Sequence, residues 1–194
     1  MQKAIKSIIS YGIIHYSQMP GAAPISIGSS PSNDESGLPI LYSLLDGSPG
    51  GGTPLCFQLN EVVKEITALA PQLRAAGKKA SVIIYTDGEA SDGDITIALR
   101  PLTGLPVWVV IRLCTDDEAV VTYWNNVDDQ IELNMDVIDD PVGEGKGIYK
   151  LNPWLTYGTP LHRLREFGVT AKEIDMIDEK KLSIDQMRNV CAFM

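Results

Sequence analysis

Residues 82–94 read VIIYTDGEASDGD, and this stretch decides how the chain is expected to fold. It begins with four apolar or aromatic residues and continues into a cluster of carboxylates around Gly88 and Gly93. A continuous apolar run is typical of a strand that is buried on both faces in a parallel sheet. In open α/β sheets, binding sites form beyond the carboxyl ends of such strands. The stretch therefore predicts a buried strand and a candidate site directly after it.

The segments around this strand alternate between helical and extended patterns. Apolar residues from Leu55 to Leu73 recur at steps of 4, 3, 4, 3 and 4, which predicts a long amphipathic helix. Thr53 is expected as its N-cap, Pro54 as its first residue and Gly77 as its C-terminal glycine. Further strands are predicted at 106–113 and 131–138, and further helices at 94–102, 116–126, 161–167, 171–177 and 184–193.

The N-terminal part of the chain is less regular. Helical spacing predicts a helix over 2–17, a short strand is expected at 24–28, and residues 29–52 form a long loop interrupted by LPILYSLL at 38–45. The alternation of helices and strands predicts a doubly wound, three-layer α/β sandwich of Rossmann-like type with a mainly parallel central sheet. We expect one α/β domain over 1–140 and a helical C-terminal extension over 141–194 that packs on it.

Composition restricts the class of partner. The formal net charge of −9 repels nucleic acid and anionic lipid, and it suits basic protein partners or divalent cations, although solubility alone accounts for such a charge. The 3 cysteines are widely spaced and show neither a disulfide framework nor a zinc pattern, so a cytoplasmic, reducing location is expected. No signal peptide is recognised, and no apolar run approaches the ~20 residues that span a bilayer.

Two polar segments follow predicted strands, Thr86-Asp87-Gly88 and the segment 114–117. Carboxylates and hydroxyls are the ligands that Mg²⁺, Mn²⁺ and Ca²⁺ prefer. The same residues also suit plain turns, in which Asp87 opens a turn and Asp92 caps the next helix. GEGKG at 143–147 lacks the spacing of a phosphate-binding loop and is expected to be a mobile loop. Acyl-transfer catalysis has little support, because no nucleophile elbow is present.

Several of these segments together resemble the von Willebrand factor type A domain over about residues 1–140. The likeness is carried by GGTPL at 51–55, the amphipathic helix, VIIYTDG at 82–88, and PVWVVIRL followed by an acidic segment. In that family a divalent ion at the top of the sheet is held by an Asp-x-Ser-x-Ser loop, a threonine and an aspartate. Thr53 and Asp87 match the last two. The resemblance implies protein binding, Mg²⁺ (or Mn²⁺ or Ca²⁺) as the cofactor, and partner contacts at Gly52, Gly88, Glu89 and Asp116.

The chain departs from that pattern at the first loop. The Asp-x-Ser-x-Ser motif precedes the first helix in the family, whereas this chain begins at that helix. We therefore expect a fragment, a strand supplied by another subunit, or a rearranged fold. Thr53 and Asp87 alone predict weak or absent cation binding, because such ions take about six oxygen ligands.

The resulting prediction is a non-enzymatic protein-interaction module. The alternatives are a structural subunit of an oligomer or larger assembly, and a metal-dependent hydrolase that uses Asp87, Glu89, Asp92 and Asp116.

Overall fold

The computed structural model describes residues 12–14, 25–27, 52–168 and 171–193. Contacts divide the chain into two compact units. The first comprises residues 1–62 and 90–94, and the second comprises residues 63–89 and 95–194. None of the helices in these described ranges is long and apolar enough to cross a membrane.

The first unit contains a small antiparallel pair of strands, β1 (Gly12–Ile14) and β2 (Ile25–Ile27). The strand predicted at 24–28 is confirmed over Ile25–Ile27. The helix predicted over 2–17 is wrong at Gly12–Ile14, which is extended, because β-branched residues favour strands once a pairing partner is present. The rest of that predicted helix and the segment 38–45 lie outside the described residues.

Helix α3 (Leu55–Ala75) confirms the predicted amphipathic helix, but its N-terminus is stabilised differently. The backbone N–H groups of Cys56 and Phe57 donate to the carboxylate of Asp92, at 3.0 and 2.8 Å. Asp92 therefore binds N–H groups in the first turn of α3 that have no acceptor within the helix, although it lies far from them in the sequence. The predicted roles of Thr53 as N-cap of this helix and of Asp92 as cap of the following helix are both wrong.

The C-terminus of α3 ends as the sequence predicts. Gly77 has a φ of 62°, in the left-handed region that glycine adopts readily. The N–H of Lys78 donates to the carbonyl of Leu73 at 2.9 Å, and that of Gly77 to Arg74 at 3.1 Å. This pattern satisfies the last carbonyls of the helix and turns the chain toward the next strand.

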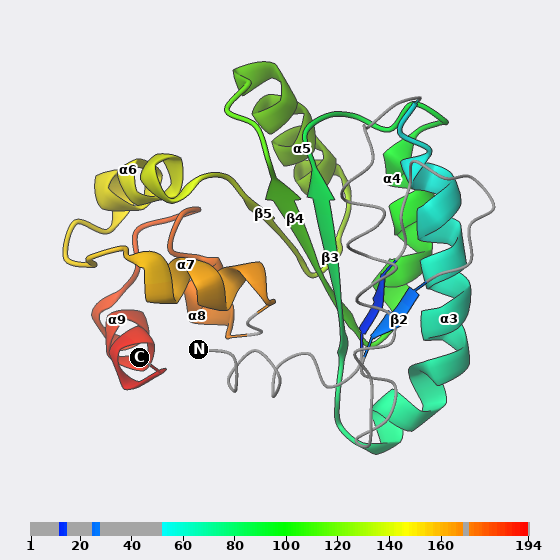
Figure 1. The fold of residues 1–194 in the computed structure, drawn as a ribbon. Coiled ribbons are helices and arrows are strands. Elements are labelled where there is room, and N and C mark those ends of the chain that lie inside the picture. Colours follow the sequence, from blue (N-terminus) through cyan, green and yellow to red (C-terminus); the bar gives the residue numbers. More distant parts are fainter. Residues whose placement is uncertain (1–11, 15–24, 28–51, 169–170, 194) are drawn as a thin grey trace. The chain divides into compact units, whose positions relative to one another are not determined.

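The second unit is built on a three-stranded parallel sheet in the order β3-β4-β5 (Figure 1). The strands are β3 (Ala80–Thr86), β4 (Val107–Leu113) and β5 (Met135–Ile138). β4 is the middle strand and is almost fully buried, as its apolar sequence predicts. Within the described residues β3 pairs with β4 only, and Tyr85 is 60% exposed. The expectation that β3 is buried on both faces is therefore wrong at that residue.

Helices cover both faces of this sheet, which confirms an α/β architecture compatible with a Rossmann-like sandwich. In Figure 1, α4 and the part of α3 from residue 63 lie on one side, and α6 to α9 lie on the other. The remaining helices are α4 (Ile95–Leu99), the 3₁₀ helix η1 (Arg100–Gly104), α5 (Glu118–Gln130), α6 (Pro141–Leu151), α7 (Thr159–Glu166), α8 (Lys172–Asp175) and α9 (Ile184–Phe193).

Helices α6 to α9 share a hydrophobic core of their own. The segment 143–147 is part of α6, so the prediction of a mobile loop there is wrong. Asp140 accepts the N–H groups of Val142 and Gly143, and Pro141 starts the helix, which offsets the low helix propensity of glycine. The shared core comprises Ile148, Leu155, Leu161, Ile174, Met176, Ile177, Leu182 and Val190.

The C-terminal helices pack closely against the sheet through the end of α7. The hydroxyl of Ser81 in β3 donates to the carbonyl of Phe167 at 3.1 Å. Gly168 follows with a φ of 78°, and a Cβ atom there would lie 2.9 Å from a ring carbon of Trp108. Glycine is thus required at this point for both its conformation and its lack of a side chain.

Candidate functional site

The turn that follows β3 is held by hydrogen bonds to its backbone. The hydroxyl of Thr86, which is 7% exposed, donates to the carbonyl of Gly88 at 2.9 Å and accepts the Gly88 N–H at 3.3 Å. The same carbonyl accepts a hydrogen bond from the indole Nε1 of the fully buried Trp124 at 3.1 Å. Asp87 and Glu89 are exposed on either side of this fixed glycine. We call residues 86–89 the acidic turn.

A second polar loop begins beside the acidic turn. The N–H of Cys114 donates to the carbonyl of Thr86 at 2.8 Å, so the loops after β3 and β4 leave the same edge of the parallel sheet. Asp117 accepts the N–H of Ala119 at 2.8 Å and caps α5. Asp116 has no capping role and is exposed. The structure thus brings Asp116 to the same sheet edge as Asp87, Gly88 and Glu89, and their role in partner binding stays a prediction.

Gly52 and Thr53 belong to the first unit, in a loop packed against residues 90–94. The carbonyl of Thr53 accepts the N–H groups of Leu55 and Ser91, at 2.7 and 2.9 Å. A Cβ atom at Gly52 would lie 2.7 Å from the hydroxyl oxygen of Ser91, so this glycine permits a close approach. Thr53 and Asp87 lie in different units, and their pairing around a cation stays a prediction.

Asp92 has a structural role in this first unit. Partial burial raises the pKa of Asp92. The N–H groups of Phe57 and Cys56, which bind its carboxylate, outweigh this effect and hold the pKa below its usual range. Burial, followed by the nearby charge of Asp92, raises the pKa of the Cys56 thiol to about 11. The thiol is therefore protonated at neutral pH and is a poor nucleophile. Asp92, engaged in capping α3, is an unsuitable member of the four-acid set of the predicted hydrolase.

The described residues do not by themselves fit a divalent cation. Within them, no three His, Cys, Asp or Glu side chains converge in a way that could hold a metal ion. The hydroxyl of Thr86, the one nearest to Asp87 in the sequence, is already engaged with the backbone of Gly88. Asp87 would supply one carboxylate, far fewer than the about six oxygen ligands that Mg²⁺ requires.

A buried charge network that was not predicted from the sequence centres on Arg165 of α7. The guanidinium is 0% exposed and contacts Asp136 of β5 at 2.7 Å and Glu144 of α6 at 2.5 Å, and it also binds Asp178. Burial opposes its charge, but these three carboxylates keep the pKa of Arg165 above its ordinary value. The network joins the sheet to three segments of the C-terminal helices, and its role is structural. One signal was available, since an aspartate inside an apolar strand needs a buried partner.

His162 of α7 is also buried. It is 2% exposed, and its Nδ1 lies 2.9 Å from the hydroxyl oxygen of Tyr157. Its Nε2 lies 3.3 Å from a carboxylate oxygen of Glu166. Burial outweighs the charge of Glu166 and lowers the pKa of His162. The imidazole is therefore a neutral packing residue, inaccessible to a substrate.

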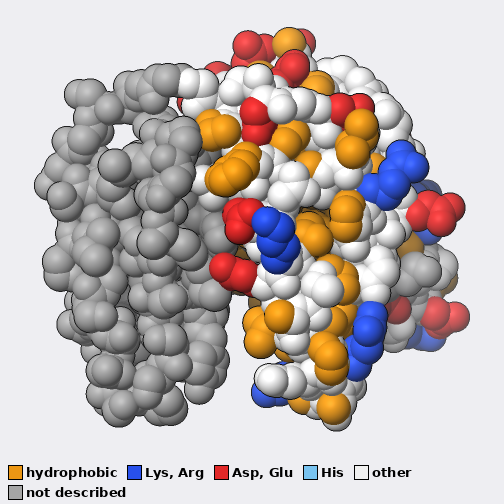
Figure 2. All heavy atoms as spheres, turned by 90° about the vertical axis from the view of Figure 1, so that its right-hand side faces the viewer, with side chains coloured by type: hydrophobic (Ala, Val, Ile, Leu, Met, Phe, Trp, Pro, Cys, Tyr) orange, Lys and Arg blue, Asp and Glu red, His pale blue; other side chains and the backbone are white. Residues whose placement is uncertain are grey.

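The face of the molecule shown in Figure 2 has a mixed character. Hydrophobic side chains lie there among acidic and basic ones, without a uniform charge. Phe57 and Leu69 of α3 are 49% and 44% exposed, which is ordinary for single surface residues. Charge alone therefore does not mark this face as a binding surface.

No protein-family model matches the chain. No curated protein and no solved structure matches it either.

Proposed function

We propose that the protein is a non-enzymatic interaction module of von Willebrand factor type A-like architecture that binds a basic segment of a protein partner at the acidic turn. The observation that carries the proposal is the fixed backbone of Gly88 between two exposed carboxylates. Because Thr86 and Trp124 already order this turn, little conformational entropy is lost when a partner binds. The turn is thus a preorganised acidic surface.

The chemistry of this edge favours arginine and lysine in the partner. Asp87, Glu89 and Asp116 are exposed at the carboxyl end of the sheet. A guanidinium group can bind a carboxylate through two parallel hydrogen bonds, which gives orientation as well as attraction. A single exposed ion pair contributes only about 0–1 kcal/mol, so several such pairs must act together. The net charge of −9 adds long-range attraction for a basic partner.

This mode of binding needs no cation, because carboxylates attract a basic partner directly. The affinity is therefore expected to be the same with EDTA as with added Mg²⁺. A loss of affinity on EDTA treatment that Mg²⁺ restores would instead support the metal-dependent site predicted at Thr53 and Asp87.

The proposal is tested by selecting peptides from a random display library on the immobilised full chain. The expected result is enrichment of sequences rich in arginine and lysine. Amide NMR shifts on adding one such peptide should concentrate at residues 86–89 and 114–117. Enrichment of neutral or acidic peptides, or shifts that fall elsewhere, would contradict the proposal.

A second candidate function, as a subunit of a larger assembly, is favoured by β3. This strand has seven residues without proline or charge, and in the described part of the chain it pairs only with β4. Apolar edge strands of this kind tend to pair with other chains. Light scattering coupled to size-exclusion chromatography tests this function. A monomer at all concentrations whose outward β3 amides exchange rapidly would contradict it.

A further inference from the structure

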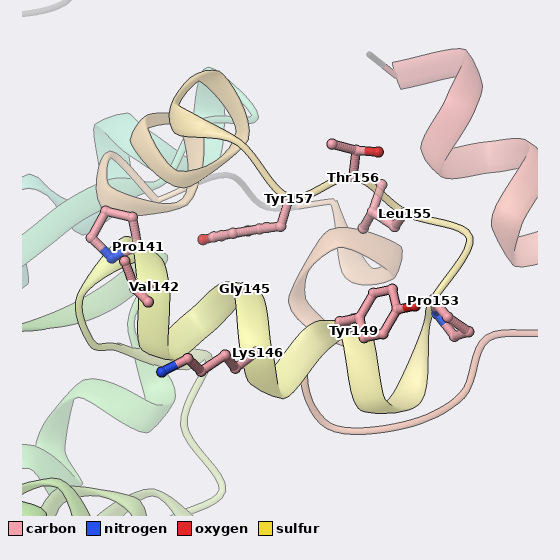
Figure 3. Close-up of a pocket in the computed structure, with 9 residues that line it drawn as sticks. All are labelled: Pro141, Val142, Gly145, Lys146, Tyr149, Pro153, Leu155, Thr156 and Tyr157. Carbon is pink, nitrogen blue, oxygen red and sulfur yellow. The ribbon is translucent and has the colours of Figure 1, made fainter.

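An open groove runs along the outer face of α6 (Figure 3). Its cavity volume is about 490 Å³, within the range of small-ligand and peptide sites. Tyr149 and Val142 are 64% and 62% exposed, so the groove is open along its side. Its lining is mainly apolar and comprises Pro141, Val142, Gly145, Lys146, Tyr149, Pro153, Leu155, Thr156 and Tyr157.

Two tyrosine rings and two prolines dominate this lining. Hydrogen bonds to its hydroxyl group hold the ring of Tyr157 in place. The hydroxyl oxygen lies 2.9 Å from Nδ1 of His162 and 3.4 Å from a guanidinium nitrogen of Arg165. The ring of Tyr149 projects from α6 at the opposite end of the groove from Val142 (Figure 3). Aromatic walls of this kind bind proline-rich segments, whose polyproline II conformation exists before binding.

The charge of the groove indicates which proline-rich segments fit it. Lys146 is the charged residue in the lining, and its side chain lies along the rim (Figure 3). Lys150 follows one turn later on α6 and is also exposed. Lys146 therefore gives the groove lining one positive charge, in a protein whose net charge is −9. An acidic residue in the bound segment would complement Lys146, whereas a basic one would be repelled.

The glycines of α6 are consistent with a groove that is kept open. A Cβ atom at Gly143 would lie 2.6 Å from a carboxylate oxygen of Asp139, so packing explains that glycine. A Cβ atom at Gly145 would meet only a ring carbon of Tyr157, at 3.8 Å, yet this glycine lines the groove. At Gly147 there is open space, and nothing in the structure explains the glycine there. The missing side chain at residue 145 leaves room for an occupant.

We propose that this groove binds a proline-rich segment of a partner in the polyproline II conformation, with an acidic residue of that segment placed against Lys146. The tyrosine rings supply apolar contact area, and the lysine supplies orientation. The site is separate from the acidic turn and does not depend on it.

The experiment uses a short polyproline peptide that contains one glutamate, titrated into the full chain and followed by amide NMR. We expect saturable shifts confined to residues 141–157. A peptide with lysine in place of glutamate should bind about two- to fivefold more weakly at low salt, and added salt should reduce this difference. A glycine-rich peptide with the same glutamate should not bind, because it lacks the preformed conformation.

Two variants locate the binding in the groove. Gly145→Leu fills the groove and should abolish binding, whereas Gly147→Leu is the matched control and should leave it unchanged. Both replacements introduce the same side chain into α6, and neither Cβ meets an atom closer than ordinary contact distance. Absence of saturable shifts, equal binding by the two variants, or equal binding of the glutamate and lysine peptides would overturn the proposal. None of these outcomes bears on the acidic turn.

Discussion

Arg165 links the C-terminal helices to the sheet through buried ion pairs. Its replacement by methionine would leave Asp136 and Glu144 buried without their counter-charge. Breaking a buried pair in this way costs about 3–5 kcal/mol. We expect Arg165→Met to lower the free energy of unfolding by that amount in urea titrations.

The neighbouring Arg163 is a matched control. Its side chain is 65% exposed and pairs with Glu166. Because Arg163 is exposed and Arg112 still pairs with Glu166, Arg163→Met should lower the free energy of unfolding by less than about 1 kcal/mol. A loss of similar size in both variants would show that the network around Arg165 is not the source of its effect.

Trp124 has a more local influence, on the acidic turn. Trp124→Phe keeps an aromatic ring in the core but removes the indole N–H that binds the carbonyl of Gly88. The loss of one such hydrogen bond should cost about 1 kcal/mol of stability. Hydrogen exchange in residues 86–89 should accelerate by more than exchange across β4. Uniform acceleration would mean that the indole does not specifically order the turn.

Which residues are exposed at the candidate site could be read from the sequence, but the contacts that hold them could not. Asp87 follows directly on a buried strand, so its position at the sheet edge was predictable. Asp92 instead binds Cys56, which is 36 residues away, and Arg165 binds Asp136 across 29 residues. No periodic pattern reports contacts of this length. The local pattern therefore predicted Asp92 as the cap of the following helix instead.

At the scale of elements, α3 provides a test of the cap supplied by Asp92. Asp92→Ala should cost about 0.5–2 kcal/mol at neutral pH, the usual effect of losing an N-cap. The N–H donors hold the pKa of Asp92 below its ordinary 3.8. Its negative charge therefore stabilises the folded state at pH values above 3.8. The stability difference between wild type and variant should shrink as the pH falls through the folded-state pKa. A difference independent of pH would contradict the charged cap.

Helix α6 shows why local composition misled the prediction of a loop. Its three glycines favour a loop, yet Asp140 caps the helix and the fully buried Ile148 anchors it. Tertiary packing thus outweighs propensity here. By contrast, the helix predicted at 184–193 is confirmed as α9, and at its start Ser183 and Gln186 exchange hydrogen bonds at 2.9 and 3.3 Å.

The same helix allows a paired prediction. Gly147→Ala has open space around the new Cβ and should stabilise the protein by about 0.5–1 kcal/mol, because alanine is the better helix former. Gly143→Ala should destabilise it, because the new Cβ would approach the carboxylate of Asp139 to 2.6 Å. Thermal unfolding of the two variants checks both signs. Equal effects would indicate that residues 143–147 are not helical in solution.

At the scale of the whole molecule, the excess of acidic groups around Arg165 predicts how stability depends on pH. Burial and then the charge of Asp136 raise the pKa of Asp128 and of Asp175 from the ordinary 3.8 to about 7. Between pH 3.8 and about pH 7 the folded state therefore binds more protons than the unfolded state. Stability should fall as the pH rises from about 4 to about 7, as linkage requires.

Asp175→Asn isolates one of these two groups. The amide cannot ionise, so the fall in unfolding free energy between about pH 4 and about pH 7 should be smaller in the variant than in wild type. Urea titrations at a series of pH values measure this slope. An unchanged slope would mean that Asp175 titrates normally in the folded protein.

The alternation of helices and strands made the α/β class and the parallel sheet of the second unit predictable. The division into two compact units was not, because the segment 90–94 joins the first unit from within a loop of the second. The exposure of β3 was also missed, since its apolar sequence is that of a strand with neighbours on both sides. The resemblance to von Willebrand factor type A domains remains a prediction.

The proposed function is tested most directly by titrating one selected basic peptide into three proteins and measuring the dissociation constants by calorimetry. The proteins are wild type, the double variant Asp87→Asn/Glu89→Gln, and the control Asp129→Asn/Glu132→Gln, which removes the same charge from exposed residues outside the acidic turn. Two lost ion pairs should weaken binding about tenfold in the first variant, whereas the control should bind like wild type. Equal weakening in both variants would show that net charge, and not the acidic turn, attracts the peptide.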